Sequence, residues 1–168
     1  MFLLDTITDA GRVLLTLIGL SSPYPDVTIS DSVLRINREG ACIEFRAAPL
    51  VNKQLRELAD SGYTLNILAD YTVRSGNAEP VNRKSERSVY RAASGWIISD
   101  EQTNRIYPDF NSMTNAVSRF VLPVLPVSET QPGKEVDVTA ELGVSCAEIP
   151  NVIELWGNRP RLHQSFRL

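Results

Sequence analysis

The stretch YTLNILADYTVR, residues 63–74, alternates between apolar and polar side chains. Successive side chains of a β-strand point to opposite faces of the sheet, so this period of two predicts a strand with one buried face and one face in water. The polar residues Asn66, Asp70 and Thr72 fall on the wet face. The positions that share the apolar face are Tyr63, Leu65, Ile67, Ala69, Tyr71 and Val73.

The same pattern returns in residues 135–146. Its apolar positions are Val136, Val138, Ala140, Leu142 and Val144, and they alternate with polar residues or glycine. Two half-buried strands of this kind are typical of an antiparallel sheet.

Length and composition indicate one globular unit. The chain has 168 residues, of which 43% are hydrophobic and 22% charged. We expect a single β-rich domain over residues 23–168, including a C-terminal tail, preceded by a separate segment, residues 1–22. The formal net charge is −3 and the basic residues are scattered, which disfavours nucleic-acid binding.

Residues 1–22 have the pattern of an amphipathic helix. A secretory signal is disfavoured because the apolar stretch 13–20 lacks a basic start, and a membrane-spanning helix is disfavoured because charges at positions 5, 9 and 12 leave too short an apolar run. The apolar side needs cover from the chain's own sheet, a partner chain or a membrane surface. Its predicted docking residues are Leu3, Leu4, Ile7, Leu14, Leu17 and Ile18.

Shorter patterns predict the remaining elements. Residues 27–36 and 41–48 form a hairpin around a polar turn that ends in glycine, and residues 50–59 form a short helix that ends before Gly62. Residues 75–86 are expected to be a long surface loop, which would leave the basic residues Arg83, Lys84 and Arg87 largely in solvent rather than in a ligand patch.

The second half is predicted in the same way. Residues 87–99 form one strand with a bulge or kink at Ser94-Gly95, and residues 105–107 form a brief one. Asp109 or Asn111 caps a helix whose apolar side runs from Met113 to Val121. A proline-containing connector follows from Pro123, and the tail after Pro150 packs as an added edge segment.

These elements predict a mainly β, α+β fold. We expect an antiparallel β-sandwich or one curved sheet, with the N-terminal amphipathic helix and two short inserted helices.

Reactive chemistry is sparse. His163 is the only histidine, and a satisfied or solvent-facing role is favoured over a catalytic one. Asp100-Glu101 and Asp26 with Asp31 are formal carboxylate pairs, but acidic turns are common for reasons of solvation. We therefore expect no enzyme, no catalytic or metal site and no cofactor.

Cys42 and Cys146 lie far apart in the sequence, each in a predicted strand. They are either buried free thiols or one disulfide that joins two strands. Free cysteine is among the most buried residue types, which favours the thiols.

The order of these features resembles a family of small bacterial β-rich proteins of unassigned function. The shared features, over residues 27–168, are the hairpin with Phe45, the Leu55 to Leu58 helix, the strands Tyr63 to Arg74 and Tyr90 to Trp96, the Met113 to Phe120 helix and the closing strand with the Trp156 tail. Members are usually exported or membrane-tethered. The resemblance implies a non-enzymatic role and slightly favours the cell envelope, periplasmic or membrane-associated, over the cytoplasm, although the acidic N-terminus departs from an export signal.

Two functions follow as hypotheses. The first is a binding or structural subunit that docks on a protein partner or membrane assembly through its N-terminal helix. The alternative is a small-molecule or lipid carrier, with Tyr63, Ile67 and Tyr71 lining the concave face of the sheet.

Overall fold

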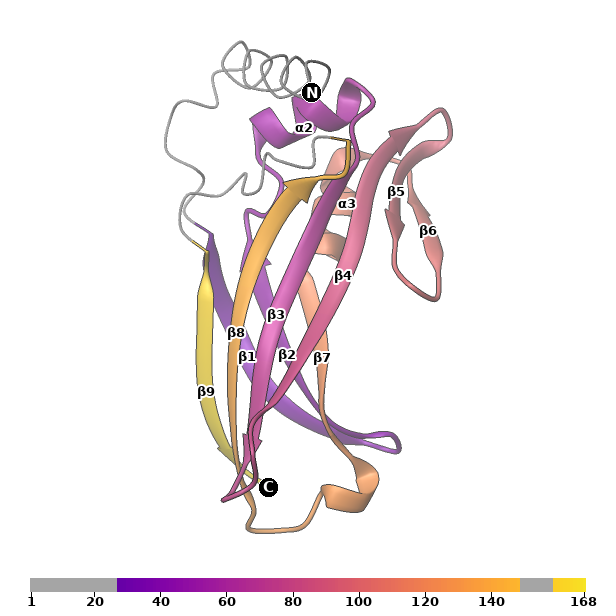
Figure 1. Ribbon diagram of the computed structural model, residues 1–168. Helices are drawn as coiled ribbons and strands as arrows, with labels where there is room; N and C mark the ends of the chain where they lie inside the picture. Colours follow the sequence, from indigo (N-terminus) through magenta and orange to yellow (C-terminus); the bar gives the residue numbers. More distant parts are fainter. Residues whose placement is uncertain (1–26, 149–158) are drawn as a thin grey trace, which may run out of the picture.

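The computed structural model describes residues 27–148 and 159–168, which form two antiparallel sheets that lie face to face (Figure 1). The three-stranded sheet has the order β1 (Thr28–Asn37), β2 (Gly40–Ala48) and β7 (Arg119–Pro126). The six-stranded sheet has the order β6 (Asn104–Tyr107), β5 (Gly95–Ser99), β4 (Val81–Ala92), β3 (Leu65–Ser75), β8 (Glu135–Cys146) and β9 (Arg161–Arg167). The predicted β-rich class is therefore confirmed.

The two alternating stretches form the centre of the six-stranded sheet. β3 and β8 pair antiparallel along their whole length, from Leu65 opposite Cys146 to Ser75 opposite Val136. Every second residue of β3 is buried, as the pattern predicted. Tyr63 is half-buried and precedes the strand.

The core lies between the sheets. Phe45 of β2 and Phe120 of β7 stack in parallel, with ring centroids 5.0 Å apart. They are opposite each other in the register, and both point towards the six-stranded sheet. Tyr71 of β3 reaches across and donates its hydroxyl hydrogen bond to the Pro123 carbonyl at 3.1 Å. Buried apolar area of this kind is the main stabilising term of such a fold.

Two short helices close one end of the sheets (Figure 1). α2 (Lys53–Asp60) begins where the Asn52 side chain accepts from the Leu55 N–H at 2.9 Å, and it ends before Gly62, whose φ of +93° suits glycine. α3 (Phe110–Val117) is capped by Asp109, as predicted. A further 3₁₀ turn, η1, covers Val127–Glu129.

The loop predicted for residues 75–86 is wrong. β3 ends at Ser75, and β4 begins at Val81 and pairs with β3 as far as Leu65. The inward positions of β4 include Arg83 and Arg87, whose side chains lie over the core and donate to backbone carbonyls of β7 and of the last residue of α3. Arginine stems cover apolar surface while their heads find acceptors, so this half of the strand lacks apolar alternation.

The helix predicted to run to Val121, and the proline connector after it, are also wrong. α3 ends at Val117, and β7 pairs with β2 through Pro126. Pro123 is tolerated because β7 is an edge strand and the register shifts opposite it, between Ala41 and Cys42.

Residues 87–99 do not form one strand. β4 ends at Ala92 and β5 begins at Gly95, so Ala93 and Ser94 form the turn of a hairpin in place of a bulge. The tail does add an edge segment: β9 pairs with β8 from Arg161 to Arg167.

Candidate functional site

The predicted docking residues Leu3, Leu4, Ile7, Leu14, Leu17 and Ile18 lie outside the described residues, as do the N-terminal helix itself and Asp26. The docking hypothesis for this segment stays a prediction.

His163 faces solvent on β9, as expected. Its Nδ1 lies 3.1 Å from the Thr139 hydroxyl on the neighbouring strand. The two cysteines are buried free thiols. Burial raises the pKa of the Cys42 thiol, with a further increase from the nearby charge of Glu44.

Asp100 caps the turn between β5 and β6. Its carboxylate accepts from the N–H groups of Gln102 at 3.0 Å and Thr103 at 2.8 Å, and these bonds lower the pKa of Asp100. The carboxylate therefore holds the hairpin tip together.

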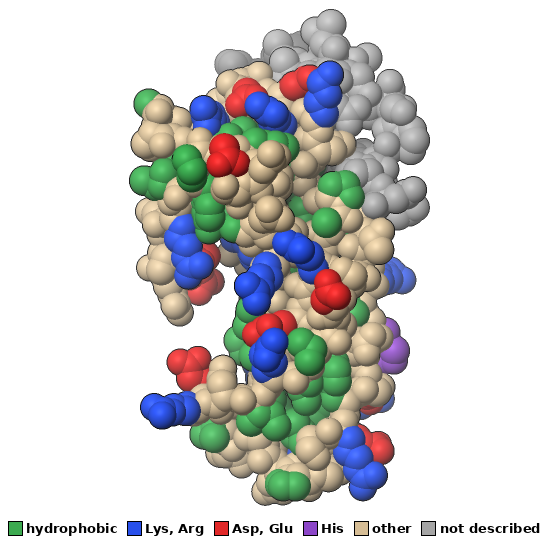
Figure 2. Space-filling model, turned by 180° about the vertical axis from the view of Figure 1, so that it is seen from behind, with side chains coloured by type: hydrophobic (Ala, Val, Ile, Leu, Met, Phe, Trp, Pro, Cys, Tyr) green, Lys and Arg blue, Asp and Glu red, His purple; other side chains and the backbone are tan. Residues whose placement is uncertain are grey.

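The outward side of the three-stranded sheet carries a mixed set of charged and apolar residues. We call it the outer face and define it by its side chains, Val33, Arg35, Glu44, Arg46, Arg119 and Val121. Seen from this side, basic, acidic and hydrophobic side chains gather close together over the middle of the molecule (Figure 2).

The strand register places these residues in rows. Glu44 of β2 lies opposite Val33 of β1 on one side and Val121 of β7 on the other. The two valines are 41% and 52% exposed and flank the same glutamate. Glu44 forms an ion pair with Arg35 at 2.8 Å.

The next row brings two cations together. Arg46 and Arg119 are direct cross-strand partners. Like charges in this position repel each other, because their Cβ atoms are only about 5 Å apart. Arg46 donates to the Asn115 side chain at 3.0 Å and to the Ser118 hydroxyl at 3.4 Å. Within residues 27–148 and 159–168, the Arg119 guanidinium has no hydrogen-bond or ion-pair partner.

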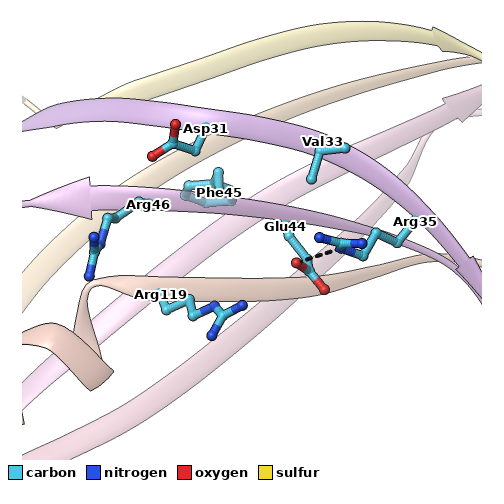
Figure 3. A pocket seen from close by; sticks show the side chains of 7 residues that line it. All are labelled: Asp31, Val33, Arg35, Glu44, Phe45, Arg46 and Arg119. Atoms are coloured by element: carbon cyan, nitrogen blue, oxygen red, sulfur yellow. Dashed lines mark hydrogen bonds and ion pairs between the residues drawn. The ribbon is translucent and has the colours of Figure 1, made fainter.

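A shallow hollow of about 370 Å³ lies among these side chains. It opens beside an irregularity of β1, where the register with β2 shifts between Ser30 and Val33 and where Asp31 has a φ of +55°. This conformation is uncommon for a residue with a side chain. Figure 3 shows Asp31 on β1 and Arg119 on β7, at opposite sides of the hollow, with β2 between them.

A third arginine, Arg87, lies beneath the three-stranded sheet, on its inner side. Arg87 of β4 donates to the backbone carbonyl of Arg119 at 2.9 Å and to that of Val117 at 3.3 Å. Desolvation lowers the pKa of Arg87, partly offset by the charge of Asp100. No carboxylate of the described residues forms an ion pair with Arg87, whose guanidinium lies over the Phe120 ring and does not line the hollow.

None of the outer-face residues was singled out from the sequence, because the site exists only in the register of strands that are far apart in the chain. Arg46 and Arg119 look like isolated surface cations until β2 and β7 are paired. The alternation of Phe120, Leu122 and Val124 is the signal that would have found β7.

No helix among the described residues is both long and apolar enough to cross a membrane. No cluster of three or more His, Cys, Asp or Glu side chains among them is placed to hold a metal ion.

Comparison of the chain with protein-family models, with curated proteins and with solved structures gave no match.

Proposed function

We propose that this protein is a non-enzymatic binding or structural subunit that docks on a protein partner. The observation that carries the proposal is the outer face, where Val33 and Val121 are exposed on either side of the Glu44–Arg35 ion pair. Arginine is enriched at protein interfaces, and the buried centre of an interface is more apolar than the rest of the surface.

The sheet that presents this face is rigid. Its inner side is fixed by the Phe45–Phe120 stack and by the bonds from Tyr71 and Arg83 to the Pro123 carbonyl. A preorganised surface loses little conformational entropy on binding, which favours docking without rearrangement.

The amphipathic pattern of residues 1–22 supplies a second docking element in this proposal, on a protein or membrane assembly, and the envelope location implied by the resemblance remains part of it. The carrier alternative has less support. Ile67 and Tyr71 are 1% and 5% exposed and pack against the three-stranded sheet, so the face that would hold a ligand is used by the core.

Affinity capture from native cells tests the proposal. The full chain should recover a partner that Val33→Asp with Val121→Asp releases, because a buried unpaired charge weakens an interface strongly. Ile106→Asp is the matched control, since Ile106 is 60% exposed on β6, away from the outer face. A shorter chain that lacks residues 1–22 separates the contribution of that segment.

Capture that is equally strong with the double substitution and with the control would remove the outer face from the proposal. Circular dichroism of each variant checks that the fold is retained.

A further inference from the structure

The Arg46–Arg119 pair is an unusual feature of the outer face. Opposite cross-strand positions normally hold complementary side chains, and two cations there oppose folding. Besides Glu44, Asp31 is the other carboxylate that lines the hollow; it accepts a hydrogen bond from the Ser30 hydroxyl and lies two strand spacings, about 10 Å, from β7. No ion pair joins it to either arginine, both of which are described.

Both arginines have N–H groups that can donate hydrogen bonds to a ligand. Arg46 uses its Nε and Nη2 atoms for Ser118 and Asn115, which fixes the side chain and leaves Nη1 for a ligand. All the N–H groups of the Arg119 guanidinium remain for a ligand, while the Arg119 backbone carbonyl accepts a hydrogen bond from Arg87. Figure 3 shows the Arg119 side chain extended along the sheet towards Glu44 and the Arg46 side chain directed the other way. Both side chains are exposed, so an acceptor that lies between their ends would be within reach of both.

The charge around the hollow selects the kind of anion. Its lining contains three arginines and two carboxylates, which leaves one excess positive charge. Glu44 and Asp31 on the same face disfavour a doubly charged phosphate, whereas a single carboxylate neutralises the excess. Arginine also matches a carboxylate in geometry, because its planar group donates two parallel hydrogen bonds.

We propose that Arg46 and Arg119 form a binding site for an Asp or Glu side chain of a protein partner, with apolar neighbours of that acid packing on Val33 and Val121. This inference rests on the proposed docking through the outer face and adds the chemistry that selects the partner.

The Arg119 side chain then serves binding rather than stability, whereas Arg46 also bonds to Asn115 and Ser118. Arg119→Gln relieves the repulsion, so the midpoint of urea unfolding should stay the same or rise. Lys84→Gln removes one charge from an exposed residue of β4 and is the matched control for general electrostatic attraction.

The binding test is a titration of the isotope-labelled full chain, followed by NMR. The probes are acetyl-Val-Asp-Val-Asp-Val-amide, its isosteric Val-Asn-Val-Asn-Val amide, and inorganic phosphate. The acidic peptide should shift the Arg119 Nε–Hε signal and the Val121 methyl signals saturably, with an affinity about tenfold or more above that of the amide peptide. Arg119→Gln should abolish the shifts, Arg119→Lys should weaken them, and Lys84→Gln should leave them.

Equal shifts with both peptides, no saturable shift, or equal loss in Lys84→Gln would overturn the inference. Saturation by phosphate as tight as by the acidic peptide would also overturn it, in favour of a free-anion site. The proposed function fails separately, when the valine substitutions leave partner capture unchanged.

Discussion

The guanidinium of Arg87 lies 4.4 Å above the centre of the Phe120 ring, and thereby joins the two sheets at the free edge of β7. The same group donates to the carbonyls of Val117 and Arg119, which have no strand beyond them. A strand edge whose backbone groups are bonded resists association with other chains, and the half-buried Arg87 supplies the donors that a neighbouring strand would otherwise provide.

Arg87→Met should lower the free energy of unfolding by about 2–4 kcal/mol, because methionine keeps the apolar stem but leaves two carbonyls without donors. Arg91→Met is the control: Arg91 lies on the same strand, 5.4 Å from the Trp96 ring centre, and is exposed. Its loss should stay below about 1 kcal/mol. Urea unfolding measures both, and equal losses would contradict the role given to Arg87.

Gly40→Ala should destabilise the hairpin of β1 and β2 strongly. Gly40 has a φ of +136°, and an added Cβ would meet the Leu125 carbonyl oxygen, closer than any real contact. We expect a loss of about 2–4 kcal/mol in thermal or urea unfolding. Gly133→Ala, with a φ of +83° and open space around it, should cost only about 1 kcal/mol. Similar losses of stability at the two positions would contradict this expectation and show that the backbone of β7 moves at little cost to accommodate the added Cβ.

Stability should fall at acid pH partly through Asp109. Its carboxylate accepts from the Ser112 N–H at 2.8 Å, and this bond lowers the pKa of Asp109 in the folded chain. A lowered folded pKa stabilises the protein above the ordinary carboxyl value of about 3.9, and the contribution is lost as the pH falls through the folded pKa.

Asp109→Asn keeps a cap that does not titrate. The stability advantage of the wild-type chain over this variant, measured by urea unfolding, should therefore be smaller at pH 3 than at pH 7. An advantage that does not change with pH would exclude Asp109 as a contributor.

Strands with an apolar alternation were predictable from the sequence. The strands β3 and β8 follow from period two, the hairpin of β1 and β2 from its polar turn, and the cap Asp109 lies where a short polar side chain satisfies a helix start. These signals are local, so a single chain is enough to find them.

The first half of β4 and the whole of β7 were missed, for opposite reasons. In β4 the inward residues Arg83 and Arg87 are polar, so the buried side carries no apolar signal until the opposite carbonyls are in place. In β7 the alternation was present, but Val117, Phe120 and Val121 also fit a helical spacing, and Pro123 suggested a break. A strand that contains Pro123 is possible because β7 lies at the edge of its sheet. Edge position depends on the whole sheet and cannot be read from a local segment.

The outer face was unpredictable for the same reason. The Arg46–Arg119 row depends on the register of β2 with β7, and the exposure of Val33 depends on the irregularity at Asp31. Neither the register nor the irregularity can be identified from a local sequence pattern.

The most direct test of partner docking is site-specific crosslinking in native cells. A photoreactive amino acid in place of Val121 should give a discrete adduct with one other protein, and the same group in place of Ile106 should give none. An adduct at Ile106 alone, no adduct at either position, or an adduct at Val121 with only a second copy of this chain would contradict the account.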